Sequence, residues 1–109
     1  MNVNMSSTLL VCDLDVFTPA ERESHIQTTL QLYQTVQAIR EAEYGYEFIF
    51  PHTTELTKLA EFIAKEKMCC PFLDFALRIA PDKEPISLTL TGPEGTREFL
   101  REEFAEAFA

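Results

Sequence analysis

The residues with the clearest chemical potential are the three cysteines of the chain. Cys69 and Cys70 are adjacent, follow Glu66 by one helical turn and precede Pro71. Cys12 lies much earlier, in the first apolar segment. Thiolate is the ligand that soft metal ions and metalloids prefer, so three converging thiols would suit such an ion. We therefore predict a thiol site formed by Cys12, Cys69 and Cys70, with a soft metal ion as its candidate cofactor.

Three further side chains are expected beside these sulfurs, where they would orient a small ligand or balance its charge. They are Arg22, His25 and Glu66. Arg22 and His25 are three residues apart in one predicted helix and so lie on neighbouring parts of its surface. An ordinary helix-surface pair is the alternative for these two. The acidic residues of the C-terminal helix, Glu103 among them, are expected to form a solvated face with short-range ion pairs.

Two other interpretations of the cysteines stay open. Free cysteines often pack as small hydrophobic residues, which would make the chain a non-catalytic, dimeric interaction module. The thiols could instead undergo a redox cycle. Cys69 and Cys70 fall at a predicted helix C-terminus, where the helix dipole disfavours thiolate, so an activated nucleophile is not favoured. The sequence identifies no catalytic apparatus, and without a Cys-x-x-Cys spacing it does not match a structural zinc site.

The elements that must position these residues follow from hydrophobic periodicity. Period-2 alternation predicts strands and a three- or four-residue apolar spacing predicts helices. A capping box at Thr18 with Pro19 predicts a helix start, and Pro71 should end the second helix near Cys70. The predicted strands are Thr8–Phe17, 46–50, 72–80 and 86–91, and the predicted helices are 19–43, from Thr53 or Thr54 to Met68, and one beginning at Gly92-Pro93-Glu94.

This βαβαββα order predicts a single α+β domain over residues 1–109. We expect a two-layer sandwich in which a mixed four-stranded sheet carries helices mainly on one face. The other face would present Phe17, Ile49 and Phe72 among polar side chains. Such a face is either an ordinary wet surface or a homodimer interface or ligand groove, and we predict a homodimer with an unidentified small ligand.

Charge and composition exclude several classes of protein. The 18 acidic residues outnumber the 9 basic ones, which gives a net charge of −9. A polyanion would be repelled, so we expect no nucleic-acid partner. No apolar run approaches the ~20 residues of a membrane span, and the first residues do not resemble a signal peptide. An odd number of cysteines favours free thiols in a reducing compartment, so we predict a cytoplasmic protein.

Two segments carry a resemblance to a known family. Residues 66–75 read Glu-Lys-Met-Cys-Cys-Pro-Phe-Leu-Asp-Phe, and residues 92–95 read Gly-Pro-Glu-Gly before the last helix. The chain resembles a family of small uncharacterised bacterial proteins that share a Glu-Arg-x-Cys-Cys-Pro-Phe-like run and a Gly-Pro-x-Gly turn. The resemblance also covers Cys12 and Arg22, and it departs at Lys67, where the family commonly has arginine. It implies an α/β fold and supplies no reaction.

Overall fold

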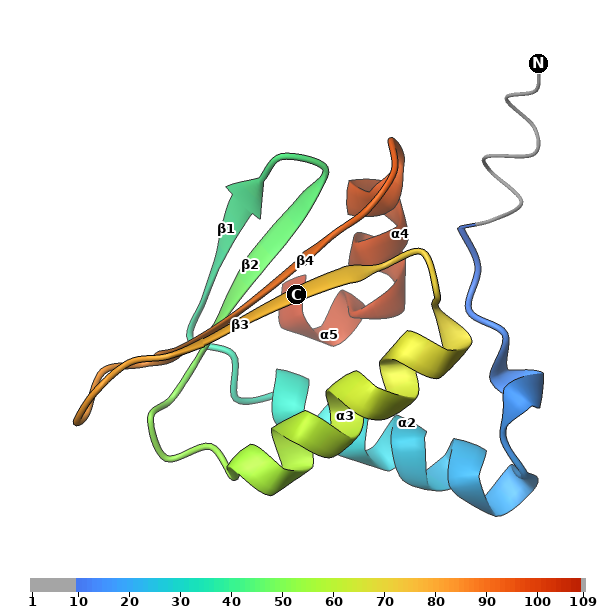
Figure 1. The fold of residues 1–109 in the computed structure, drawn as a ribbon, viewed down its shortest axis with the longest axis horizontal. Coiled ribbons are helices and arrows are strands. Elements are labelled where there is room, and N and C mark those ends of the chain that lie inside the picture. The colour runs from blue at the N-terminus through green and yellow to red at the C-terminus, as the bar shows by residue number, and fades with distance from the viewer. Residues whose placement is uncertain (1–9, 109) are drawn as a thin grey trace.

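The structure is a computed structural model that describes residues 10–108. Its α+β fold contains a four-stranded antiparallel sheet and several helices (Figure 1). The elements are η1 (Leu14–Val16), α2 (Pro19–Tyr33), β1 (Ala38–Ala42), β2 (Gly45–Phe50), α3 (Leu56–Cys69), β3 (Asp74–Ile79), β4 (Ile86–Thr91), α4 (Thr96–Glu103) and α5 (Ala105–Phe108). The sheet order is β1-β2-β4-β3.

The first predicted strand is wrong over its described part; Thr8 and Leu9 lie outside the described residues. The chain instead runs without a strand partner into the short 3-10 helix η1. The Asp13 side chain accepts a hydrogen bond from the backbone N–H of Asp15 at 3.1 Å, which begins the turn. Aspartate favours such local turns over a continuous strand.

The first helix begins as predicted and ends ten residues early. Thr18 and Glu21 form both hydrogen bonds of the capping box, but the helix stops at Tyr33. The residues predicted to continue it form strand β1, which pairs with β2 through a tight turn where Tyr44 has a φ of 58°. Pairing with β2 provides hydrogen bonds that a helix extended past Tyr33 would forgo, so tertiary context overrides the helical pattern.

The sheet is entirely antiparallel, so the predicted mixed sheet is also wrong. Strands β2 and β3, which α3 connects along the chain, do run parallel to each other, as a crossover connection requires. However, β4 lies between them and pairs antiparallel with both. Close approach of β2 and β4 depends on Gly45, because a Cβ there would collide with the carbonyl oxygen of Leu90. The predicted hairpin of the last two strands is confirmed.

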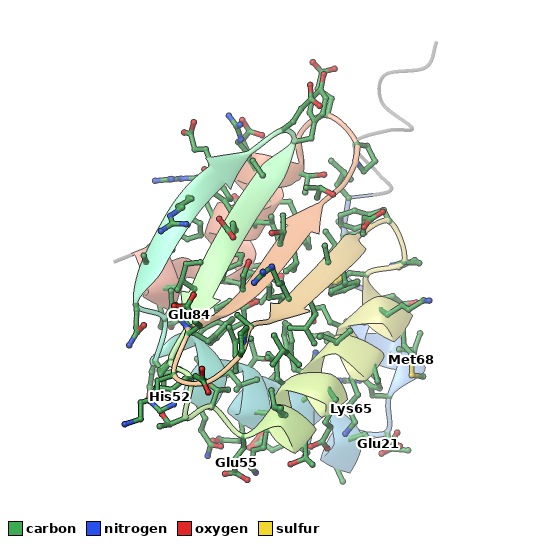
Figure 2. All side chains as sticks on the ribbon, turned by 60° about the vertical axis from the view of Figure 1, so that its left-hand side comes forward. Glu21, His52, Glu55, Lys65, Met68 and Glu84 are labelled. Carbon is green, nitrogen blue, oxygen red and sulfur yellow. A yellow bond between two sulfur atoms is a disulfide. The ribbon has the colours of Figure 1, made fainter. Side chains whose placement is uncertain are left out.

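An aromatic cluster joins the helices to one face of the sheet. Tyr33 of α2 stacks on Phe104 with ring centroids 4.4 Å apart, and its edge meets Phe48 and Phe50 of β2 at 5.1 and 5.5 Å. Figure 2 looks onto the opposite face of the sheet, with the helices behind and below it. The alternation of buried and partly exposed residues along β4 agrees with one covered and one open face.

The open face does not carry the apolar surface that the sequence suggested. Phe17 is 6% exposed and belongs to the hydrophobic core, where its ring packs on His25. Ile49 is buried, and the half-buried Phe72 packs edge-on against Phe99 at 4.9 Å. Two of the three residues are therefore buried, and the third is partly covered by Phe99. Among the described helices, none is long and apolar enough to cross a membrane.

Candidate metal centre

The C-terminal end of α3 presents two sulfur atoms side by side. Cys69 is the last residue of the helix, and Cys70 follows with non-helical backbone angles before Pro71. Proline disfavours helical geometry at the preceding residue, which explains why the helix ends there. The two Sγ atoms lie 3.7 Å apart and both side chains are fully buried. The prediction that the helix stops within the double cysteine is confirmed.

Cys12 reaches this helix end from the segment that precedes η1. The backbone N–H of Asp13 donates a 2.8 Å hydrogen bond to the carbonyl oxygen of Cys69. This bond fixes the neighbouring Cys12 over the end of α3, and the Cα atoms of Cys12 and Cys70 lie 4.6 Å apart. Their Sγ atoms are at disulfide distance, although the residues are 58 positions apart in the sequence. The predicted convergence of the three sulfurs is therefore seen, with Cys12 in the segment before η1 rather than in a strand.

Glu66 completes the group. Its side chain is 1% exposed and lies one helical turn before the cysteines. Oε2 is 3.4 Å from Cys70 Sγ and 4.0 Å from Cys12 Sγ, whereas Oε1 is 3.8 Å from Cys69 Sγ. One ligand atom from each of these four residues lies within 4.8 Å of all the others, a spacing at which they could hold one metal ion.

His25 holds the carboxylate of Glu66 from the opposite side. Its Nε2 lies 2.8 Å from Glu66 Oε1, and both side chains are almost completely buried. Phe17 and Phe62 flank the imidazole ring at 5.5 and 5.8 Å. Histidine paired with a ligating carboxylate fixes the orientation of that carboxylate, so His25 fits a supporting role rather than a direct one.

Arg22 does not join the cluster. Its Nη2 lies 3.2 Å from Asp15 Oδ1, an ion pair near the surface that ties the start of α2 to η1. Arg22 therefore braces the segment that carries Cys12.

Negative charge and burial dominate the electrostatics. Burial is the largest of the causes that raise the pKa of the Cys69 thiol to about 12, and the nearby charges of Glu66 and Glu103 contribute the next largest parts of that shift. The same two causes, burial and then Glu66, raise the pKa of the Tyr33 hydroxyl well above its ordinary value. Partial burial, followed by the charge of Glu66, raises the pKa of Glu103 to about 7, while His25 opposes this shift. A cation at the cluster would relieve this accumulated negative charge.

Glu103 is the residue that the sequence prediction misplaced. Its Oε2 lies 3.5 Å from Cys12 Sγ, so it faces the cluster instead of belonging to a wholly solvated helix face. A signal was present, because Glu103 follows the buried Leu100 by three residues and precedes the buried Phe104, next to the apolar stripe of its helix.

A small cavity adjoins the carboxylates of Glu66 and Glu103. Its volume is about 110 Å³, and its lining includes both glutamates, His25 and the apolar side chains of Leu14, Ile26 and Leu30. That space is enough for a few water molecules and too small for a drug-sized organic ligand. The cavity therefore provides a place for water or a small ion beside the cluster.

No family model, curated protein or solved structure matches the chain. Its function must therefore be inferred from the chemistry of this cluster.

Proposed function

We propose that the reduced protein binds one soft metal ion or metalloid through the thiolates of Cys12, Cys69 and Cys70, with the Glu66 carboxylate as fourth ligand. The observation that carries the proposal is the approach of four ligand atoms to within 4.8 Å of one another. Thiolate-rich sites favour soft ions, which agrees with three sulfurs and one oxygen.

Tetrahedral zinc provides a scale for these separations. With zinc–sulfur bonds of about 2.3 Å, two sulfur ligands stand about 3.8 Å apart. The observed distance between Cys69 Sγ and Cys70 Sγ is 3.7 Å. A sulfur and a carboxylate oxygen would stand about 3.5 Å apart, and the distance between Cys70 Sγ and Glu66 Oε2 is 3.4 Å. Cys12 and Cys70 must separate to bind one ion, which reduction of their bond permits.

The surroundings support binding of a cation in three ways. Glu66 is oriented by His25, as second-sphere partners of metal ligands commonly are. The buried negative charge that opposes ionisation of Cys69 favours a cation once that thiol has lost its proton. The adjoining cavity offers space beside the carboxylates for a solvent molecule.

Cadmium titration of the fully reduced chain tests the proposal. We expect stoichiometric binding of one ion with sub-micromolar affinity, read from thiolate-to-metal charge-transfer absorption, with arsenite as the metalloid probe. Cys69→Ser should abolish binding and Glu66→Gln should weaken it. Glu61→Gln is the matched control, since it removes the same charge from an exposed position of α3 that pairs with Lys65. Equal affinity of wild type and Cys69→Ser would refute the proposal.

A second function, reversible thiol oxidation, is favoured by one specific observation. The Sγ atoms of Cys12 and Cys70 lie at disulfide distance. Hydrogen peroxide, a two-electron oxidant, would convert the two thiols into one disulfide and leave two water molecules. Cys69 would stay reduced. Peptide mapping after peroxide treatment should then find Cys12 linked to Cys70 and Cys69 unmodified. Linkage of any other pair would refute this assignment.

The remaining parts of the proposal concern the setting of the protein. A reducing compartment such as the bacterial cytoplasm would keep Cys12 and Cys70 as thiols available to a metal. We likewise propose that the chain belongs to the family that shares the Cys-Cys-Pro-Phe run, because residues 66–75 and 92–95 resemble the motifs of that family. The covered and open faces of the sheet support the two-layer sandwich as a description of the fold.

A further inference from the structure

Strand β3 forms one edge of the sheet and is unusually exposed for an apolar strand. Among residues 10–108 it pairs with β4 alone. Leu77 and Ile79 stand opposite the buried Leu88 and Ile86 on the core side of the sheet, yet they are 41% and 54% exposed. An exposed apolar edge offers unpaired N–H and C=O groups to another strand.

The opposite edge of the sheet is protected. Strand β1 carries Arg40 and Glu41, and both charges are paired within the chain. Arg40 lies 3.7 Å from Glu47, and Glu41 lies 3.8 Å from Arg97. Charged residues are a common means of preventing a sheet edge from pairing with another chain. The two edges therefore differ, and only β3 combines an open backbone with exposed apolar side chains.

We propose that β3 pairs antiparallel with β3 of a second copy of this chain, about a two-fold axis, to join two sheets into one. This surface is independent of the cysteine cluster and goes beyond the proposed metal binding. The second copy is the favoured occupant because the strand is complementary to itself in charge, as its register shows.

Only one two-fold register of β3 matches charges. In a symmetric antiparallel pair one residue faces its own copy, and directly opposite side chains share a face. Centring the axis on Ala76 places Asp74 opposite the partner's Arg78, twice by symmetry. Centring it on Phe75 or Leu77 leaves both charges opposite uncharged residues. Centring it on Asp74 or Arg78 opposes like charges.

The same register also suits the other face of the strand. It places Phe75 opposite the partner's Leu77, and these apolar residues lie on the core side of the sheet. Among the described residues, neither Asp74 nor Arg78 takes part in an ion pair within its own chain, so both are available to a partner. A pair of six-residue strands is a small interface, so the dimer should form reversibly and depend on concentration.

Sedimentation equilibrium of the full chain over a concentration series, with reductant present throughout, tests the proposal. We expect the mass to rise from 12.5 kDa toward twice that value. Arg78→Asp should weaken association about tenfold or more, because two attractive cross-strand pairs become two repulsive ones. Asp74→Arg should have the same effect. Arg40→Asp, a charge reversal on the other edge, is the matched control and should leave association unchanged.

Two complementation experiments test the register itself. The double variant Asp74→Arg with Arg78→Asp should regain the association of the wild type. An equimolar mixture of the two single variants should also form dimers, because one carries two positive and the other two negative residues at these positions. Thermal melts followed by circular dichroism verify that each variant folds.

The outcomes are decisive. A monomer at every concentration overturns the proposal. Pairing of β3 with a strand of an unrelated protein, in place of a second copy, overturns it too. Failure of both complementation experiments in a protein that does dimerise overturns it as well. Cadmium binding by the same samples is measured separately, so loss of the metal site and loss of the dimer are distinguishable.

Discussion

The thiol of Cys69 should be almost inert to alkylation in the folded, reduced protein. Its side chain is fully buried and its pKa is raised from 9.0 to about 12. Only thiolate reacts with iodoacetamide. At about pH 8 the thiolate fraction falls from about one in ten to about one in ten thousand. The shift in pKa alone therefore predicts a rate about a thousandfold slower than that of an unfolded chain.

Mass spectrometry of timed iodoacetamide reactions can follow the three cysteines separately. Cys12 is only partly buried and provides the internal reference, so it should be labelled first. Glu66→Gln should accelerate labelling of Cys69, because the charge of Glu66 contributes to the raised pKa. Glu61→Gln, on an exposed position of α3, should not change the rate.

Two results would refute this reasoning. Labelling of Cys69 in the native protein as fast as in urea would show that neither burial nor charge protects it. An unchanged rate in Glu66→Gln, in a protein that still folds, would remove the electrostatic cause.

The raised pKa of Cys69 also predicts how stability depends on pH. Its contribution to the free energy of unfolding is present below about pH 9 and is lost as pH rises toward 12. Alkaline conditions should therefore destabilise wild type more than Cys69→Ala, by at most about 4 kcal/mol.

Three further perturbations have expected outcomes. Phe104→Ala should lower the free energy of unfolding by about 3–5 kcal/mol in urea titrations, since its ring is buried and stacked on Tyr33; a loss below about 1 kcal/mol would contradict this packing. Thr18→Ala should cost about 1 kcal/mol by removing the capping box, and Thr18→Ser should retain most of the stability. The pKa of about 7 at Glu103 predicts stability that is present below about pH 4.5 and lost as pH rises through 7, about 1 kcal/mol after solvent screening; Glu103→Gln should remove this dependence, and a pH profile identical to wild type would count against the shift.

The helix ends that the sequence predicted well are those marked by a proline or a capping box. Pro71 fixes the end of α3, and the capping box at Thr18 fixes the start of α2. The charged residues of β1 suit a helix as well as a strand, and only the pairing with β2 decides between them. That pairing is a long-range contact, which periodicity within one segment does not encode.

The first predicted strand shows a related limit. Val11 and Asp13 are exposed, whereas Cys12 and Leu14 pack against the core, so the alternation of the sequence is present in the structure as far as Asp15 and is lost at the exposed Val16 and the buried Phe17. Alternation reports which side chains face the core, and it does not require a neighbouring strand. Within the described part of the chain, the backbone N–H of Asp13 has no strand partner and donates its hydrogen bond instead to the carbonyl oxygen of Cys69.

The hydrogen bond between Asp13 and Cys69 explains why the position of Cys12 in the site could be predicted although the strand predicted to carry it does not form in the described residues. A partly apolar Cys12 must be turned inward, and the end of α3 is the place where its extended segment is anchored. Convergence of the sulfurs therefore requires only an inward-facing Cys12 and a helix α3 that ends within the double cysteine. The acidic half of the cluster is different, because Glu66 and Glu103 come from separate helices whose packing brings them together. Their joint charge, which governs both the thiol and any bound cation, is a property of the tertiary structure.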